Sequence, residues 1–285
     1  MVNGFILIDK KIGVTSRSVD NKIQRLFHTR KVGHLGTLDP FASGLLIIAI
    51  DKGCKALPYI DDSFKTYRAV LSLGKKTNTG DLTGEVIEEK EVPELYIEDI
   101  LEVFEDLYGE SEQIPPMTSA IHVDGKRLYE LARKDIEVER KPRKIIIKSL
   151  KIVGFDGLNL EFEVICSKGT YVRTLGEDIA SKLDTVGHLT FLRRLAIGDI
   201  PLDKAIDIDE LKETDLVNPI ELISLKHLIV RDEKTIKEVK DGKEILLETE
   251  DDKVLLCYYD NNGLSPLAVY ERKVDNVYSS IRGLW

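Results

Sequence analysis

Residues 33–50 read Gly-His-Leu-Gly-Thr-Leu-Asp-Pro-Phe-Ala-Ser-Gly-Leu-Leu-Ile-Ile-Ala-Ile, which places one carboxylate just before an apolar run. The last six residues form a continuous apolar stretch of strand length, typical of a central strand buried on both faces. Pro40 disfavours the α region for the residue before it, so Asp39 is expected to be extended, while Gly33 and Gly36 permit a tight loop. The stretch therefore predicts a rigid loop, anchored from behind by a core strand, that aims the Asp39 side chain.

The string around Asp39 is far more specific than an Asp-Pro pair, which alone usually marks only the start of a turn. It resembles the catalytic loop Gly-His-x-Gly-x-Leu-Asp-Pro of the TruB family of tRNA pseudouridine synthases, in which the aspartate is the nucleophile that isomerises a uridine of the T-loop. Further matches run in the family's order over residues 4 to about 200: Lys65-Thr66-Tyr67-Arg68, Ile114-Pro115-Pro116-Met117-Thr118-Ser119-Ala120, Lys168-Gly169-Thr170-Tyr171-Val172-Arg173 and Phe191-Leu192-Arg193-Arg194.

Two positions depart from the family pattern. The first family motif usually reads Asp-Lys-Pro-x-Gly, whereas residues 9–13 read Asp-Lys-Lys-Ile-Gly and lack the rigid turn that proline supplies. His122 stands where a lysine is common and would weaken one phosphate contact. Neither change removes a residue with a catalytic role in the family.

The resemblance implies an α+β fold in which residues 1–222 form the pseudouridine synthase catalytic domain, with a mixed, mainly antiparallel sheet and flanking helices. A thumb insertion that grips RNA is expected at about 117–145. Residues 223–285 contain short strand-like runs broken by Asp, Asn and Gly, which predict a small β-rich domain. In size and position that domain is similar to the PUA-like, RNA-contacting module of bacterial family members. A length of 285 residues favours two domains in any case.

Residue patterns alone predict several elements. Ser16 can cap a helix whose Val19, Ile23 and Leu26 share one face. Helical spacing of apolar residues within 97–107 predicts an amphipathic helix. The other predicted elements are strands at 5–8, 67–74, 145–153 and 158–165, a helix at 170–183, irregular structure with short helices at 199–225, and short strands at 228–230, 244–247, 254–259 and 267–270.

Taken alone, the net charge of −9 opposes RNA binding, which depends on Lys and Arg releasing counterions from phosphates. Residues 81–112 alone carry a charge of −12, so the rest of the chain is at +3. Residues 113–151 hold ten basic and five acidic side chains, and residues 1–50 hold seven and three. Such runs are often only solvated surface, but their place beside the predicted thumb favours phosphate contacts. The acidic face of the 97–107 helix is expected to point away from RNA.

Asp39, Tyr67 and Arg173 are the predicted catalytic residues. A nucleophilic carboxylate must be ionised, yet a pocket for a flipped base desolvates it, and the Arg173 guanidinium can offset this by pairing with Asp39. Tyr67 can offer an aromatic face to the uracil, and the resemblance places its phenol near the carbon-5 proton. Residues 78–84, Asn-Thr-Gly-Asp-Leu-Thr-Gly, resemble a further family loop that is expected to give structural support.

RNA contacts are predicted from matched positions and from the basic segments. His34 occupies the family position that stacks into the RNA where the flipped base used to be, although a loop histidine is more often a hydrogen-bonding residue. Tyr171 and Leu192 correspond to base contacts, but both could equally be core residues. The predicted contacts are His34, Tyr171, Leu192, Lys10, Lys65, Arg127, Arg143 and Lys144.

Pseudouridine formation is an isomerisation without net redox change, so no cofactor and no metal are expected. Three widely spaced cysteines fit neither a zinc pattern nor a disulfide framework, and no segment reads as a signal peptide or membrane span. The expected setting is a cytoplasmic monomer that binds the T-stem-loop of tRNA, isomerises uridine 55 and requires no protein partner. Whether Asp39 attacks the anomeric carbon or carbon 6 stays open.

Two other classes of protein are possible. A non-catalytic RNA-binding or tRNA-folding protein would be expected to lack Asp39, Tyr67 or Arg173, and all three are present. A dyskerin-type, guide-RNA-dependent synthase subunit shares the aspartate loop but typically has long basic terminal extensions. The first motif begins close to residue 1, which favours a stand-alone enzyme.

Overall fold

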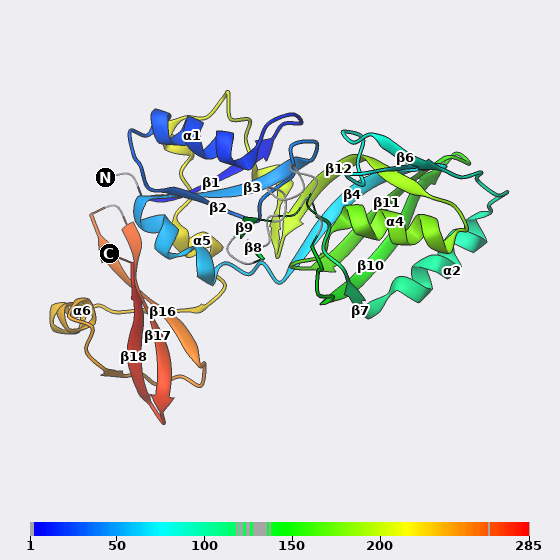
Figure 1. Ribbon diagram of the computed structural model, residues 1–285. Coiled ribbons are helices and arrows are strands. Elements are labelled where there is room, and N and C mark those ends of the chain that lie inside the picture. Colours follow the sequence, from blue (N-terminus) through cyan, green and yellow to red (C-terminus); the bar gives the residue numbers. More distant parts are fainter. Residues whose placement is uncertain are drawn as a thin grey trace.

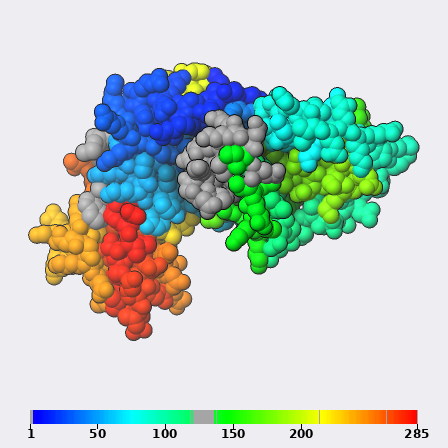
Figure 2. Space-filling model, in the orientation of Figure 1, coloured from blue at the N-terminus to red at the C-terminus, as the bar shows by residue number. Residues whose placement is uncertain are grey.

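The structure, a computed structural model, describes residues 3–117, 119, 122, 123, 126, 127, 136, 138–261 and 263–284. Figure 1 shows a body built on one large sheet, followed by a smaller sheet near the C-terminal end. In Figure 2 the smaller sheet, orange to red, forms a lobe below the blue and cyan part of the body. No helix among the described residues is long and apolar enough to cross a membrane.

The large sheet is mixed and mainly antiparallel, as predicted. Neighbouring strands along it are antiparallel except β3 and β12, which run parallel. Its order is β1 (Gly4–Lys10), β3 (Ser43–Ile50), β12 (Gly187–Ile197), β4 (Phe64–Leu73), β11 (Asn159–Ser167), β10 (Arg143–Phe155) and β7 (Gly109–Gln113), while β2 (Val32–Leu35) also pairs with β3, and β13 (Ile200–Pro201) with β12.

Strand β3 confirms the predicted core strand, because all eight of its residues are buried. It pairs with β1 and β2 along most of its length and meets β12 only at its first two residues. Gly44 makes that meeting possible: its φ is +104°, and a Cβ there would lie 2.2 Å from the Arg194 carbonyl oxygen. Glycine is therefore required where the strand that follows the Asp39 loop crosses β12.

The helices that the sequence predicts in the body are present. The predicted helices are confirmed as α1 (Ser16–Leu26), α2 (Ile97–Leu107) and α4 (Val172–Lys182). The predicted cap of α1 is wrong by one residue, because the Thr15 side chain accepts the Ser18 amide. Ser16 instead exchanges two hydrogen bonds with the backbone of Leu38 at 2.9 and 3.2 Å, which ties α1 to the Asp39 loop.

The C-terminal sheet has the order β14 (Lys226–Ile229), β16 (Lys253–Asp260), β17 (Gly263–Val274), β18 (Val277–Gly283) and β15 (Ile245–Leu246). Alternate residues of β16 face opposite layers: Leu255 and Cys257 join a cluster with the body, while Val254 and Leu256 pack in a second cluster with residues of α6 (Glu233–Lys240). The predicted small β-rich unit is confirmed, whereas α6 and β18 were not predicted. The boundary at 222/223 stays a prediction.

About half of the predicted thumb, 117–145, lies outside the described residues; what is described includes β8 (His122–Val123) paired with β9 (Lys126–Arg127). The irregular structure predicted at 199–225 is confirmed by short elements. The remaining elements are β5 (Lys75–Thr77), β6 (Val86–Glu89), α5 (Pro219–Leu222) and the 3₁₀ helices Asp51–Lys55, Leu57–Tyr59, Leu202–Lys204 and Glu213–Asp215.

Candidate active site

The loop that carries Asp39 joins β2 to β3 and is fastened on its outer side. The Gly13 amide donates to the Pro40 carbonyl at 2.8 Å, in addition to the bonds between Ser16 and Leu38. Gly36 has a φ of +69°, so this turn does require glycine, whereas Gly33 lies inside β2 and does not form part of the loop as expected. The loop is thus held by α1 and by the 9–13 segment as well as by β3.

Asp39 and Arg173 form the expected ion pair. Arg173 Nε lies 2.9 Å from Asp39 Oδ2, and Arg173 Nη1 donates to the Thr79 carbonyl at 2.8 Å. Arg173 is 4% exposed in the first turn of α4, so it is not a surface arginine, while 37% of the Asp39 side chain is exposed. The arrangement presents one carboxylate to solvent and backs it with a buried, permanently charged guanidinium.

Asp81 is a second carboxylate beside the same guanidinium. Its Oδ2 lies 3.7 Å from Arg173 Nη1, and the residue is 4% exposed. Its Oδ1 accepts the Thr83 amide at 2.9 Å and the Thr79 hydroxyl at 3.0 Å, which closes the 78–84 loop around it. The loop expected to give structural support therefore also fixes the backbone carbonyl that Arg173 uses.

Opposing effects act on the Asp39 carboxyl. Desolvation raises its pKa above the ordinary value, the Arg173 charge and hydrogen bond oppose this, and the Asp81 charge adds to the rise. The net direction is upward, although more than a third of the side chain is exposed, because the carboxyl lies among buried groups. Arg173 therefore limits the loss of the ionised form but does not cancel it.

Tyr67 lies on the buried face of β4, 8% exposed, opposite Arg194 of β12. Burial raises the pKa of Tyr67, and the Arg194 guanidinium, hydrogen-bonded to the phenol, opposes the rise. Arg194 is 1% exposed and also donates to the carbonyls of Leu45 at 2.8 Å and Gly36 at 2.6 Å. It joins the Asp39 loop, β3 and Tyr67, a role that the sequence analysis did not identify.

Lys10 and Lys65 were expected to contact RNA, and the structure places both beneath the surface. Lys10 is 0% exposed, and its ammonium donates to the carbonyls of Lys11 at 3.0 Å and Val14 at 2.7 Å. Desolvation lowers the pKa of Lys10 to about 8. Lys65 is 8% exposed and donates to Asp62 at 3.2 Å. The ammonium groups of both side chains are hydrogen-bonded within turns beneath the surface, so neither is placed to contact RNA.

The remaining predicted contacts are distributed around Asp39 and Arg173. His34 in β2 is partly exposed, with Nδ1 2.9 Å from Asp20 Oδ2. Tyr171 precedes α4, and its backbone exchanges hydrogen bonds with the Gln113 side chain at 2.8 and 3.2 Å. Leu192 is 5% exposed and belongs to the same core cluster as Tyr67.

The basic pair at the start of β10, Arg143 and Lys144, lies beside Gln113, which is hydrogen-bonded to the segment before Arg173. Arg143 is the register partner of Gln113, Lys144 is its neighbour on β10, and both are exposed. Because Gln113 is hydrogen-bonded to the backbone of Tyr171, two residues before Arg173, the two cations lie at the end of β10 that is nearer to Arg173. Arg127 belongs to β9, and its side chain lies outside the described residues.

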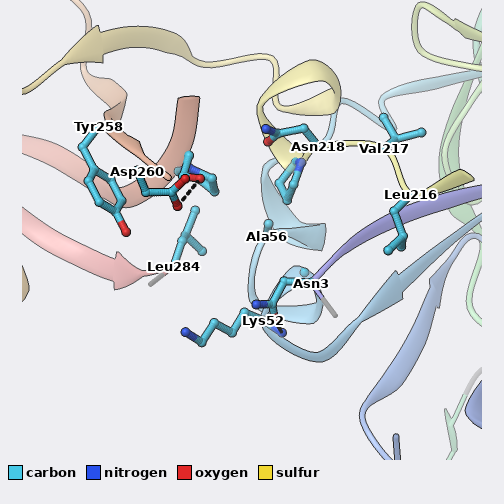
Figure 3. Close-up of a pocket in the computed structure, with 13 residues that line it drawn as sticks. Asn3, Lys52, Ala56, Leu216, Val217, Asn218, Tyr258, Asp260 and Leu284 are labelled. Carbon is cyan, nitrogen blue, oxygen red and sulfur yellow. Dashed lines mark hydrogen bonds between the residues drawn. The ribbon is translucent and has the colours of Figure 1, made fainter. Parts of the chain in front are cut away.

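Elsewhere, a cavity of about 330 Å³ lies between the C-terminal sheet and the body, and Figure 3 shows residues that line it, including Lys52 and Asn218. None of the predicted site residues lines this cavity. Within the described part of the chain, no three His, Cys, Asp or Glu residues gather as metal ligands would. Asp39, with 37% of its side chain exposed, lies outside this cavity.

The sequence profile of the family described as TruB family pseudouridylate synthase (N terminal domain) matches residues 24–172, more than half of the chain. The chain belongs to the TruB family. It is similar to tRNA pseudouridine synthase B of Psychrobacter cryohalolentis, with 44% identity over 220 residues that make up 75% of this chain and 61% of that protein. With the same-named protein of Hydrogenovibrio crunogenus it shares 41% identity over 263 residues, 91% and 86% of the two chains. The family and enzyme class predicted from the motifs are confirmed.

Among solved structures, the TruB-family chain is similar to one described as a Cbf5-Nop10-Gar1 complex, with a TM-score of 0.72 over 99% of this chain and 85% of that one. The sequence identity is 19%, so this likeness concerns the fold alone. It confirms the predicted α+β pseudouridine synthase fold with a PUA-like C-terminal region.

Proposed function

We propose that this protein isomerises uridine 55 in the T-loop of tRNA to pseudouridine, with Asp39 as the nucleophile. The observation that carries the proposal is the Asp39–Arg173 pair, in which a solvent-facing carboxylate is 2.9 Å from a buried guanidinium. The choice of tRNA as substrate is supported by relatives at 41–45% identity that are named tRNA pseudouridine synthase B.

The reaction breaks the bond between N1 of uracil and the ribose anomeric carbon and forms one from carbon 5 to the same carbon. The proton on carbon 5 leaves and N1 gains one, so atoms and electrons balance without a cofactor. Ionised Asp39 attacks one of two carbons. Attack at the anomeric carbon would hold the ribose while the base turns, and attack at carbon 6 would hold the uracil. Arg173 contributes by keeping a usable fraction of Asp39 ionised against desolvation.

Tyr67 and Leu192 would form the apolar wall for the flipped uracil. Both belong to the cluster that also contains Leu38, the residue before Asp39. Because burial raises the pKa of Tyr67, its phenol is neutral near pH 7. Stacking needs only the ring, whereas removal of the carbon-5 proton would need the Arg194 guanidinium to support a phenolate.

In the complex with RNA, the exposed cations Arg143 and Lys144 would contact phosphates, and His34 would take the place of the flipped uridine in the base stack. Base flipping costs a few kcal/mol, which these contacts must offset. A single chain suffices in this scheme. Two solved structures described as Cbf5 complexes share 19% identity with the chain, well below the 41–45% of the tRNA pseudouridine synthase B relatives, so we favour a stand-alone enzyme over a guide-dependent subunit.

The test uses a T-arm stem-loop carrying tritium at carbon 5 of its uridines, incubated with purified protein and no cofactor. We expect tritium release by the native protein and by Asp199→Asn, a control that removes an exposed carboxylate in the turn after β12. Asp39→Asn should release none. Equal release by Asp39→Asn would exclude it as the nucleophile, and tight binding without release by the native protein would favour an RNA-binding or guide-dependent protein.

A further inference from the structure

Asp20 is a buried carboxylate that the stability of the fold does not explain. It lies on the inner face of α1 with 1% of its surface exposed, beside the apolar Val19 and Ile23. Its Oδ1 has no hydrogen-bond partner among the described residues. Burying a carboxylate with one unsatisfied oxygen costs free energy that an apolar residue would not cost.

Common structural roles for an aspartate in a helix do not account for it. Thr15 already caps α1, and Asp20 is the fifth residue of the helix, beyond the first turn where a negative charge complements the helix dipole. Arg17 Nη1 is 3.7 Å away on a side chain that is 69% exposed, and such surface contacts contribute little. Among the residues that the structure describes, the one well-formed contact of Asp20 is with His34.

Both ring nitrogens of His34 are held. Nδ1 lies 2.9 Å from Asp20 Oδ2, and Nε2 lies 2.9 Å from the Thr37 hydroxyl. A carboxylate can only accept, so Nδ1 carries a proton, and Nε2 faces the loop that leads to Asp39. A buried carboxylate on one nitrogen fixes both the tautomer and the direction of an imidazole ring. His34, with 18% of its side chain exposed, therefore presents one edge in one orientation.

We infer that Asp20 is a positioning residue that orients His34 for entry into the RNA. The inference rests on the proposed function, in which His34 takes the place of the flipped base. A ring that is already oriented loses less conformational freedom on binding, so the contact contributes more to affinity. On this account the uncompensated burial of Asp20 is retained because it improves RNA binding.

The test is a double-mutant cycle on the affinity for an unlabelled T-arm stem-loop, measured by fluorescence anisotropy on full-length proteins. We expect Asp20→Ala to raise Kd about tenfold and His34→Ala to raise it at least as much. The double variant should bind like His34→Ala alone, since Asp20 then has no ring to orient. Asp20→Asn, whose amide oxygen can still accept from Nδ1, should recover part of the loss. Asn21→Ala, at the next position of α1, is the matched control and should bind like the native protein.

Thermal unfolding of each variant separates positioning from loss of structure. If Asp20→Ala weakens binding equally in both backgrounds, or leaves Kd unchanged, the inference is wrong, whatever the tritium assay shows. A native protein that fails to bind the stem-loop also overturns it. Conversely, a native protein that binds but releases no tritium would contradict the proposed function and leave the cycle to decide the role of Asp20 independently.

Discussion

The region around Asp39 and the C-terminal sheet differ in the side chains that they bury. In the described part of the chain, every buried charged residue lies between positions 10 and 194, and the set is Lys10, Asp20, Lys65, Asp81, Arg173 and Arg194. The core of the C-terminal sheet is formed instead by apolar side chains and by two tyrosines whose hydroxyls donate to backbone carbonyls.

This difference separates two uses of burial. Apolar burial stabilises a fold at little risk, whereas a buried charge costs free energy unless it is well paired. Lys10, Arg173 and Arg194 donate to backbone carbonyls near Asp39. The free-energy cost of burying these charges is therefore confined to the Asp39 loop and the segments that hold it. Changes near Asp39 should therefore reduce catalysis more than stability, and changes in the C-terminal core should do the reverse.

The largest effect is expected for Asp39→Asn, which should lower kcat at least ~10³-fold because the nucleophile is gone. The variant should be slightly more stable than the native protein at pH 7. A carboxyl with a raised folded-state pKa destabilises the fold increasingly as pH rises from the ordinary aspartate pKa to the raised one, so the amide should give a slightly higher Tm at pH 7. The gain should vanish as the pH falls toward the ordinary aspartate pKa. Tritium release measures the change in kcat, and calorimetry at pH 7 and near the ordinary aspartate pKa measures the change in Tm. A lower Tm for Asp39→Asn at pH 7 would contradict the prediction.

Arg173→Met should lower kcat by ~10²-fold, comparable to removing one preorganised donor from an active site. Without the guanidinium, Asp39 and Asp81 share a desolvated region, so the acid limb of the rate profile should move to higher pH. Arg173→Lys keeps the charge and should recover part of the activity. The control is Arg282→Met, an exposed arginine in β18. An unshifted acid limb would show that Arg173 does not tune Asp39.

In the C-terminal sheet, Leu256→Ala should lower the free energy of unfolding by about 3 kcal/mol, because it opens a cavity at a residue that is 0% exposed. The matched control is Leu246→Ala, which is 77% exposed and should cost less than about 0.5 kcal/mol. Urea unfolding measures both. At a temperature where the protein is folded, kcat for either variant should stay within about twofold of the native value; a tenfold loss for Leu256→Ala would remove the separation between the two regions.

Local patterns predicted the parts of the fold that a short segment determines. The apolar run of β3 and the helical spacing of α2 are confirmed. The approach of Arg173 to Asp39, which is not local and was predicted from the family motifs, is confirmed as well. Short polar α6 has too few apolar positions to indicate a helix, and it forms because Asp232 caps it and Val239 packs on the sheet. Its stability comes from tertiary contact, which the sequence does not display.

Buried charges were the main feature that the sequence could not reveal. Arg194 follows Arg193 in a strand and reads as a surface residue, yet it donates to carbonyls that lie about 150 positions earlier. Lys10 was expected at a phosphate for the same reason, since a lysine in a motif gives no sign that backbone carbonyls will satisfy it. The contacts of Arg194 depend on how β3 and β12 cross, which becomes visible only in the folded chain, whereas those of Lys10 depend on the turn that follows β1.

The smallest and sharpest test of the comparison is Asp81→Asn. Its charge raises the pKa of Asp39, so its removal should lower that pKa and extend activity to lower pH, by about one unit at most. Asp81 also closes the loop that supplies the Thr79 carbonyl to Arg173, so kcat at pH 7 should fall, by about tenfold. Rate profiles from pH 4 to 8 for both proteins measure the two effects together. A lower kcat plateau together with an acid limb at lower pH would show that Asp81 both holds Arg173 in place and raises the pKa of Asp39. An acid limb shifted to higher pH would mean that Asp81 acts only through Arg173.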